Sequence, residues 1–229
     1  MSFKGIFSKN NFITMTIAVI AAVVLSGGSF FALKMTTKKK ANRLITEYKK
    51  SSKYQTSTLF TPYKGSDNPK IEIISYGSFF CGHCIHFSKV VDQVLKMPKY
   101  AKVLRYYAKS FVSKRACSGG YPTCTISLLS FEMMKNGLYW EFEKRWKFSH
   151  SNPSLEKGIK IAKELLNKEI NLDEIKKNNF KYAKIIMSEV EALGVNATPT
   201  WFVNGRKIVG SVSMKVFIEF LEFLLKEKK

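Results

Sequence analysis

Two cysteines separated by two residues lie between a strand-like run and a helical pattern, and this arrangement constrains the fold more than any other feature of the chain. Residues 71–76 are apolar and β-branched, and residues 79–84 read Phe-Phe-Cys-Gly-His-Cys. Apolar side chains then recur at the spacing of one helical face: Phe87, Val90, Val91, Val94 and Leu95. The sequence therefore predicts a strand, a short turn and a helix that starts at the cysteines.

The start of a helix favours a reactive thiol. Unpaired backbone N–H groups and the helix dipole stabilise a negative sulfur, so we expect the pKa of Cys81 to lie below that of a free cysteine. Cys84 follows one helical turn later, close enough to form a disulfide with Cys81 after a mixed disulfide has formed. We interpret Cys81 as the attacking thiolate and Cys84 as the resolving thiol.

The residues around the two cysteines complete the motif. His83 can stabilise the Cys81 thiolate by its charge or by a hydrogen bond, which would make the oxidised form the less stable one. A surface histidine without a function is the alternative. Gly82 is interpreted as part of the redox motif, and His86 as a partly exposed helix residue.

A metal site competes with this interpretation, because Cys-x-x-Cys is also half of a zinc knuckle and Cys117 and Cys124 could supply the other half. Six residues separate Cys117 from Cys124, whereas structural zinc sites use shorter intervals. We therefore predict no metal and no other cofactor. Cys117 and Cys124 are expected to form a local structural disulfide, and a second redox pair is the alternative.

A second informative segment lies near the end of the chain, at residues 194–210. Two β-rich runs, 200–203 and 207–209, flank the dipeptide Asn204-Gly205, which tolerates the positive φ angles of a tight hairpin turn. Pro199 precedes the first run, one of the few positions of a sheet that accept proline. The segment predicts a β-hairpin that Pro199 opens.

Together the two segments resemble the thioredoxin superfamily, and most closely its bacterial periplasmic DsbA-like disulfide oxidoreductases. The resemblance extends from Pro69 to the C-terminus and rests on the cysteine motif, a long helical stretch after it, and the run Gly-Val-x-Ala-Thr-Pro-Thr-x-Phe-Val-Asn-Gly. It implies an α/β thioredoxin fold, in which helices flank a central mixed sheet. It also implies that Thr198 and a cis Pro199 face the cysteines and hold an extended substrate peptide.

The chain departs from the family pattern at two places. Many relatives carry a buried acidic residue six positions before the first cysteine, thought to help proton transfer from the resolving thiol, but this chain has Ser75 there. Glu72 lies three positions away from Ser75, so on a strand it points to the opposite face. The dipeptide Gly82-His83 replaces the Pro-His common in strong oxidases and also occurs in isomerases, which leaves the redox potential open.

The resemblance implies a domain of DsbA type over residues 69–229, and the rest of the sequence is compatible with it. The chain has 229 residues and is 45% apolar, enough for one domain with a core. Helical patterns repeat after Cys117, so we place an inserted helical subdomain at about 115–193, in which the aromatic run 139–146 packs in the core. A final helical pattern is expected to cover the sheet: Val216, Phe217, Phe220, Leu221 and Leu224.

A net charge of +21 raises the question of nucleic-acid binding, since lysine and arginine neutralise phosphates. The lysines are dispersed along every segment and alternate with glutamates in the helical patterns. We therefore interpret them as a solvated basic surface and predict no nucleic-acid partner.

The N-terminal part is predicted to tether the domain to a membrane. After a short tail, 1–11, the span 12–33 has no charged residue and is long enough to cross a bilayer. We interpret it as an uncleaved signal anchor, with a cleaved signal peptide as the alternative. Lysines after the span favour a cytoplasmic domain by the positive-inside rule, but the redox resemblance favours the opposite side.

Residues 34–68 are lysine-, threonine- and serine-rich and are predicted to be a linker, with a short helix near 43–48 and a short edge strand near 58–60. This segment is too short for a separate dimerisation module. We therefore expect a monomer.

The resemblance implies an extracytoplasmic oxidase on the periplasmic face of the bacterial inner membrane, or a soluble periplasmic protein if the span is cleaved. Such an enzyme transfers its Cys81–Cys84 disulfide to reduced substrate proteins through a mixed disulfide at Cys81. A quinone-linked integral membrane protein then reoxidises it. A reductase or an isomerase of the same fold is the alternative within this chemistry, and a binding module or chaperone is the alternative outside it.

Overall fold

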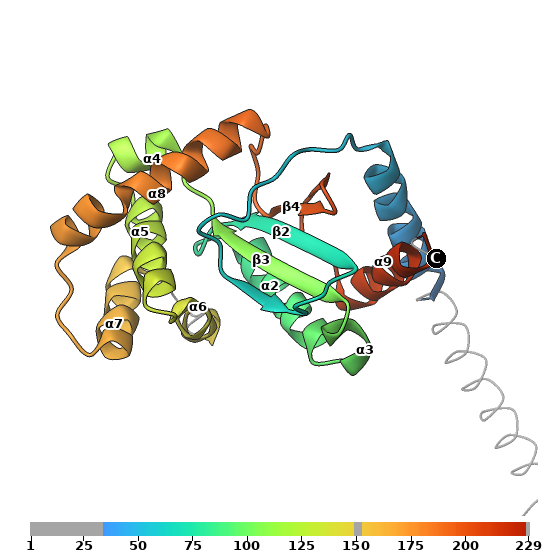
Figure 1. Ribbon diagram of the computed structural model, residues 1–229, viewed down its shortest axis with the longest axis horizontal. Coiled ribbons are helices and arrows are strands. Elements are labelled where there is room, and N and C mark those ends of the chain that lie inside the picture. Colours follow the sequence, from blue (N-terminus) through green and yellow to red (C-terminus); the bar gives the residue numbers. More distant parts are fainter. Residues whose placement is uncertain (1–33, 149–152, 228–229) are drawn as a thin grey trace, which may run out of the picture.

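A mixed sheet of five strands forms the centre of the protein in the computed structural model, which describes residues 34–148 and 153–227. The strands are β1 (Tyr63–Gly65), β2 (Ile71–Gly77), β3 (Leu104–Ser110), β4 (Thr200–Val203) and β5 (Arg206–Val209), in the spatial order β1-β3-β2-β4-β5. Strands β2 and β3 are parallel, and the other neighbours are antiparallel. Figure 1 shows the sheet between a group of helices on one side and the C-terminal helix on the other.

The helices that follow β2 fall into two groups. Those beside the sheet are α2 (Gly82–Leu95), α3 (Pro98–Ala101) and α9 (Met214–Glu227). The others are α4 (Lys114–Ser118), α5 (Pro122–Lys135), α6 (Tyr139–Phe148), α7 (Leu155–Leu166) and α8 (Leu172–Ala192), which gather on one side of the molecule (Figure 1). The second group occupies the stretch for which a helical insertion is predicted. A mixed sheet flanked by helices is the arrangement of the thioredoxin fold. The predicted fold class is therefore confirmed.

Aromatic side chains join α2 and α9 to one face of the sheet. The indole of Trp201 on β4 lies 4.8 Å from the ring of Phe87 and 5.9 Å from that of Phe217, between ring centroids. Successive residues of a strand point to opposite faces, so Ile74 and Tyr76 belong to a smaller cluster on the other face. β2 is therefore buried on both faces over most of its length, and the loop that leads to the cysteines follows it directly.

The predicted hairpin is present, with its second strand one residue longer than expected. Asn204 and Gly205 form the turn with φ angles of 48° and 84°, the left-handed region that Asn-Gly adopts most readily. The backbone N–H of Glu72 donates to the side-chain oxygen of Asn204 at 3.0 Å, and the N–H of Asn204 donates to the carbonyl of Glu72 at 2.9 Å. These two bonds fasten the turn to β2.

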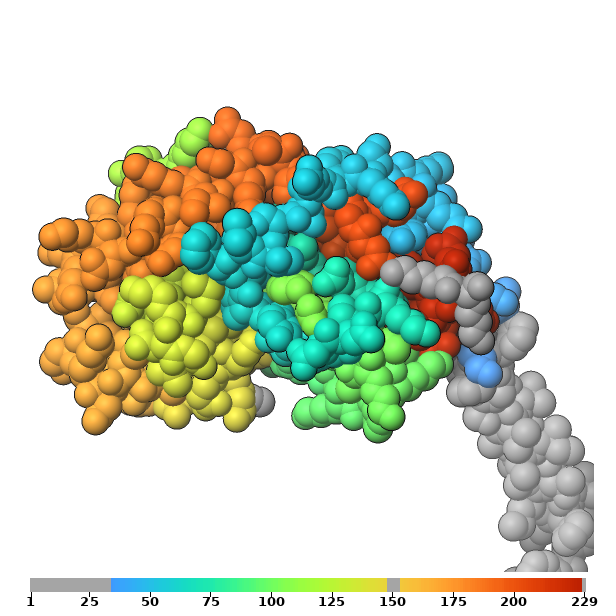
Figure 2. Space-filling model, in the orientation of Figure 1, coloured from blue at the N-terminus to red at the C-terminus, as the bar shows by residue number. Residues whose placement is uncertain are grey.

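Residues 34–50 are helical and packed, which departs from the linker expected over 34–68. Ala41, Leu44 and Tyr48 recur on one face of this helix and are buried. The ring of Tyr48 packs edge-on against that of Phe220 on α9, with 5.4 Å between centroids. In Figure 2 the blue surface of this helix lies beside the red C-terminal helix, and the cyan surface of the residues that follow it extends toward the orange helix α8.

The edge strand also lies elsewhere than expected, at Tyr63–Gly65 and not near 58–60. Phe60 has a φ of 52°, which an extended strand does not allow, and its ring packs instead against Tyr182 of α8. Pairing with β3 starts at Pro62, whose carbonyl accepts from the N–H of Ala108 at 3.1 Å.

The span 12–33, predicted as a signal anchor, lies outside the described residues. Within the part of the chain that the structure describes, each helix is too short or too polar to cross a bilayer.

The packing of helix 34–50 makes a testable prediction. Leu44→Ala should lower the free energy of unfolding by about 2–4 kcal/mol, because it leaves a cavity in the core. Asn42→Ala, an exposed position on the same helix, should change it by no more than about 0.5 kcal/mol. Urea denaturation of both variants measures the difference. Equal stabilities would mean that the segment behaves as a linker after all.

Candidate active site

Both free cysteines of the described chain lie at the start of α2. Cys81 is the N-cap residue, with an extended backbone, and its sulfur accepts a hydrogen bond from the N–H of Cys84 at 3.3 Å. The sulfur of Cys84 accepts from the N–H of Ser78 at 3.5 Å. The helix therefore begins where the sequence predicts, and its first turn holds the two sulfurs side by side.

The two thiols differ in acidity. Burial raises the pKa of Cys81, but hydrogen bonds from the side chains of Cys84 and Thr198 and from the backbone amides of Cys84 and His83 outweigh burial, so its pKa lies below the ordinary value. Burial, together with the neighbouring Cys81, raises the pKa of Cys84 to about 12. Cys81 is thus the thiol that ionises first.

His83 takes part through its backbone. Its N–H contributes to lowering the pKa of Cys81, whereas its side chain is exposed. His86 is exposed as well, as expected of a surface helix residue. A charge effect of the His83 imidazole on the thiolate stays a prediction.

The Thr198–Pro199 peptide bond is cis and lies beside the cysteines. The Cys81 thiol donates to the carbonyl of Thr198 at 3.4 Å. The sheet register explains this proximity: Thr200, the first residue of β4, pairs with Tyr76 near the end of β2. Two segments more than a hundred residues apart therefore meet at one end of the sheet.

A groove of about 240 Å³ adjoins Cys81 and Thr198. Its other lining residues come from the loop before α2, the end of β3 and the helical insertion: Ser78, Phe80, Phe111, Val112, Ser113, Ala116, Thr123 and Cys124. Most of these side chains are apolar or small. The groove was not foreseen from the sequence, because its walls come from segments far apart in the chain.

Cys117 and Cys124 are joined by a disulfide, with their Cα atoms 5.1 Å apart. The bond links α4 to the first turn of α5 and closes the loop that contains Gly119 and Gly120. It leaves neither sulfur free to bind a metal ion.

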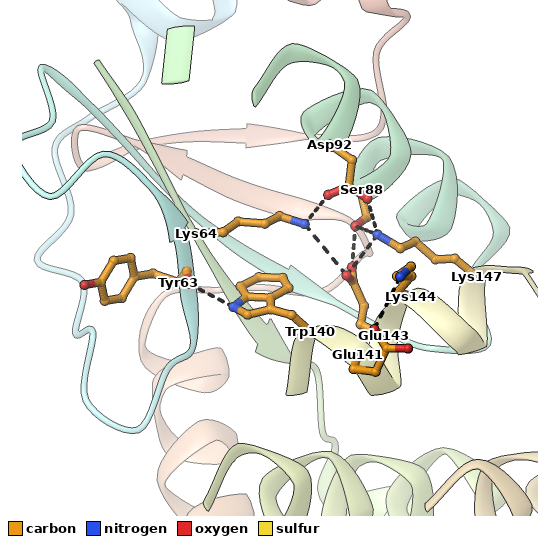
Figure 3. A network of polar contacts seen from close by, with 9 residues as sticks. All are labelled: Tyr63, Lys64, Ser88, Asp92, Trp140, Glu141, Glu143, Lys144 and Lys147. Carbon is orange, nitrogen blue, oxygen red and sulfur yellow. Dashed lines mark hydrogen bonds and ion pairs between the residues drawn. The ribbon is translucent and has the colours of Figure 1, made fainter. Parts of the chain in front are cut away.

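A charged cluster on the active-site helix was also missed by the sequence analysis (Figure 3). It consists of Lys64 on β1, Ser88 and Asp92 on α2, and Glu143 and Lys147 on α6, and we call it the α2–α6 cluster. The four-residue spacing of Glu143 and Lys147 was a signal for an ion pair on a helix. It gave no indication that both side chains are buried.

Comparisons with known proteins show the family and the fold. A family model described as thioredoxin matches residues 57–222, more than half of the chain. The chain belongs to the thioredoxin family. No curated protein sequence matches it.

Three solved structures share the fold. A periplasmic thioredoxin-like protein from Salmonella enterica serovar Typhimurium is 16% identical, with a TM-score of 0.57, and the match covers 76% of this chain and 98% of that chain. BdbD from Bacillus subtilis is 19% identical, with a TM-score of 0.56 and coverages of 77% and 97%. The thiol-disulfide exchange protein α-DsbA2 from Wolbachia pipientis is 18% identical, with a TM-score of 0.54 and coverages of 84% and 98%.

The family and the cysteine pair together define the class of protein. A dithiol at the N-terminus of a helix, opposite a cis-proline on a thioredoxin fold, is built for thiol–disulfide exchange. The chain is a thiol–disulfide oxidoreductase of the thioredoxin type.

The difference in acidity predicts a difference in alkylation. The thiolate is the reactive form, so in the reduced protein iodoacetamide should modify Cys81 with a pH midpoint below the value of about 8.5 for a free cysteine. Cys84, with its pKa raised to about 12, should stay unmodified until the solution is strongly alkaline. Mass spectrometry of peptides after timed alkylation separates the two sites. Equal rates for both cysteines at neutral pH would contradict the assignment.

The second disulfide is expected to stabilise the fold. Replacing Cys117 and Cys124 together by Ala should lower the free energy of unfolding by about 2 kcal/mol, because the unfolded chain gains freedom. The alkylation rate of Cys81 should not change. Unchanged stability with an altered rate of disulfide exchange would instead identify the pair as a second redox centre.

Proposed function

We propose that the chain is a disulfide oxidase, which donates the Cys81–Cys84 disulfide to reduced proteins. The observation that carries this proposal is the hydrogen bonding of the Cys81 sulfur at the N-terminus of α2, which lowers the pKa of Cys81. A stabilised thiolate makes the reduced form the more stable partner, and a disulfide whose reduced form is stabilised is a strong oxidant.

The reaction starts at Cys81, because Cys81 has the lower pKa and lines the larger groove beside Thr198, whereas Cys84 lines a smaller cavity and its pKa is raised. A substrate thiolate attacks the sulfur of Cys81, the Cys81–Cys84 bond breaks, and Cys84 leaves and takes up a proton. A second substrate thiolate then attacks the substrate sulfur of the mixed disulfide and releases the Cys81 thiolate. Two electrons pass from the substrate dithiol to the enzyme.

Thr198 and Pro199 are proposed to hold the substrate backbone in extended form beside Cys81. The groove beside them would accept a small or apolar side chain next to the substrate cysteine, since phenylalanines and small residues form its walls. Reduced proteins folding outside the cytoplasm are the proposed substrates.

The periplasmic relative in Salmonella supports an extracytoplasmic location, and the uncharged span 12–33 supports a membrane anchor. After each turnover the reduced cysteines need an electron acceptor. We propose an integral membrane protein linked to quinone for this step, with the enzyme acting as a monomer.

The equilibrium reduction potential of the Cys81–Cys84 pair tests the direction of the reaction. Titration against glutathione should give a value toward about −120 mV, typical of a disulfide donor. A value toward about −270 mV would make the protein a reductase.

Cys81→Ser should abolish exchange with model substrates, whereas a binding module would keep its partner. His83→Ala should lower the potential if the imidazole stabilises the thiolate.

A further inference from the structure

Behind the first turn of α2 lies a cavity of about 50 Å³, lined by Cys84 together with Ser75, Ser88, Tyr106 and Glu143 among others. A polar cavity needs only about 10–15 Å³ to hold a water molecule, so this one has room for water. Cys84 adjoins it and Cys81 does not. The cavity is therefore the local environment in which the resolving thiol gains or loses its proton.

Glu143 is the one carboxylate among the residues that line this cavity. Burial holds the pKa values of the Tyr106 and Tyr139 hydroxyls far above their ordinary range, so these groups stay protonated. The ammonium of Lys109 is engaged by the carboxylate of Glu189 on α8. The ammonium of Lys147 is engaged by the carboxylates of Asp92 and Glu143. Glu143 is thus the group in the lining that can act as a base.

The α2–α6 cluster holds this carboxylate in place (Figure 3). One oxygen of Glu143 accepts a hydrogen bond from the Ser88 hydroxyl. The other lies 2.9 Å from the ammonium of Lys147 and 3.7 Å from that of Lys64. Asp92 pairs with both lysines on the side of α2. The side chain of Glu143 is only 11% exposed, so its position is well defined.

Helical spacing connects the cluster to the resolving thiol. Cys84, Ser88 and Asp92 are four residues apart in succession, so they lie along one face of α2. The Ser88 hydroxyl stands one turn from Cys84 and touches the Glu143 carboxylate. The Cys84 thiol, the Ser88 hydroxyl and the Glu143 carboxylate therefore all border the same cavity.

We propose that Glu143 serves as the proton acceptor and donor of Cys84, through water in this cavity. When Cys84 attacks the sulfur of Cys81 in a mixed disulfide, the proton of its thiol passes to the Glu143 carboxylate, the Cys81–Cys84 bond forms, and the partner leaves as a thiolate. In the opposite direction Cys84 leaves as a thiolate and takes the proton from Glu143. The proposal rests on dithiol exchange at Cys81 and Cys84 and holds for either direction of electron flow.

Glu143→Gln changes both the local charge and the proton acceptor, and these two changes have opposite effects on the rate of attack by Cys84. The proposal is therefore testable. The cluster contains two lysines and two carboxylates, so Glu143→Gln leaves an excess positive charge near Cys84. By electrostatics alone this charge would favour the Cys84 thiolate and speed its attack. Loss of the proton acceptor would slow it. Asp92→Asn creates the same excess charge but lies outside the cavity lining, so it is the matched control.

The experiment mixes the full-length reduced protein with one equivalent of the aromatic disulfide dithiobis(nitrobenzoate). Attack by Cys81 releases a first coloured thiolate, and attack by Cys84 on the resulting mixed disulfide releases a second. Glu143→Gln should leave the first phase unchanged and slow the second on the order of 10²-fold, the size of a general-base effect. Asp92→Asn should slow neither phase.

A second phase that is unchanged in Glu143→Gln, or equally slow in Asp92→Asn, would overturn the proposal. A wild-type protein that releases only the first thiolate would overturn dithiol exchange itself, which separates the two failures. If Glu143→Gln does not fold, the wild-type pH profile decides. An internal base makes the second phase nearly independent of pH near neutrality, whereas a rate that rises about tenfold per pH unit would mean that no such base acts.

Discussion

The antiparallel pairing of β2 with β4 is the constraint on which the active site depends. It sets Thr200 opposite Tyr76, and this register brings the carbonyl of Thr198 to the thiol of Cys81. A slip by one residue would turn every side chain of β4 to the other face and remove Trp201 from the core. The turn at Asn204, fastened to Glu72, opposes such a slip. The contacts that set the register of the sheet therefore also position Thr198 beside Cys81.

The two sulfurs sit in different surroundings although they are neighbours. Cys81 adjoins the larger groove, and Cys84 adjoins a smaller cavity that the carboxylate of Glu143 also lines. Helix α2 accounts for this difference. Cys81 lies at the N-terminus of the helix, and the helix face that carries Cys84 also carries Ser88 and Asp92 of the α2–α6 cluster. Since α6 belongs to the helical group and α2 to the sheet, the cluster also joins these two parts.

Much of this arrangement could be predicted from the sequence, and the exceptions have physical causes. The helix after the cysteines and the hairpin follow from periodicity and from the turn at Asn204-Gly205. Strand β3 was not foreseen, because Lys109 interrupts its apolar pattern, and its carboxylate partner Glu189 lies far away in the sequence. Glu143 reads as a surface residue until tertiary packing buries it. Helix 34–50 was underestimated, because lysines obscure its narrow apolar face.

The packing of helix 34–50 determines where the folded domain begins. The chain leaves this helix beside Arg206, whose guanidinium donates to the carbonyl of Lys49, at the end of the hairpin remote from Pro199. Residues 34–50 therefore belong to the folded domain. An attachment made through the chain before residue 34 would lack the free length that an unstructured segment of 34–50 would provide.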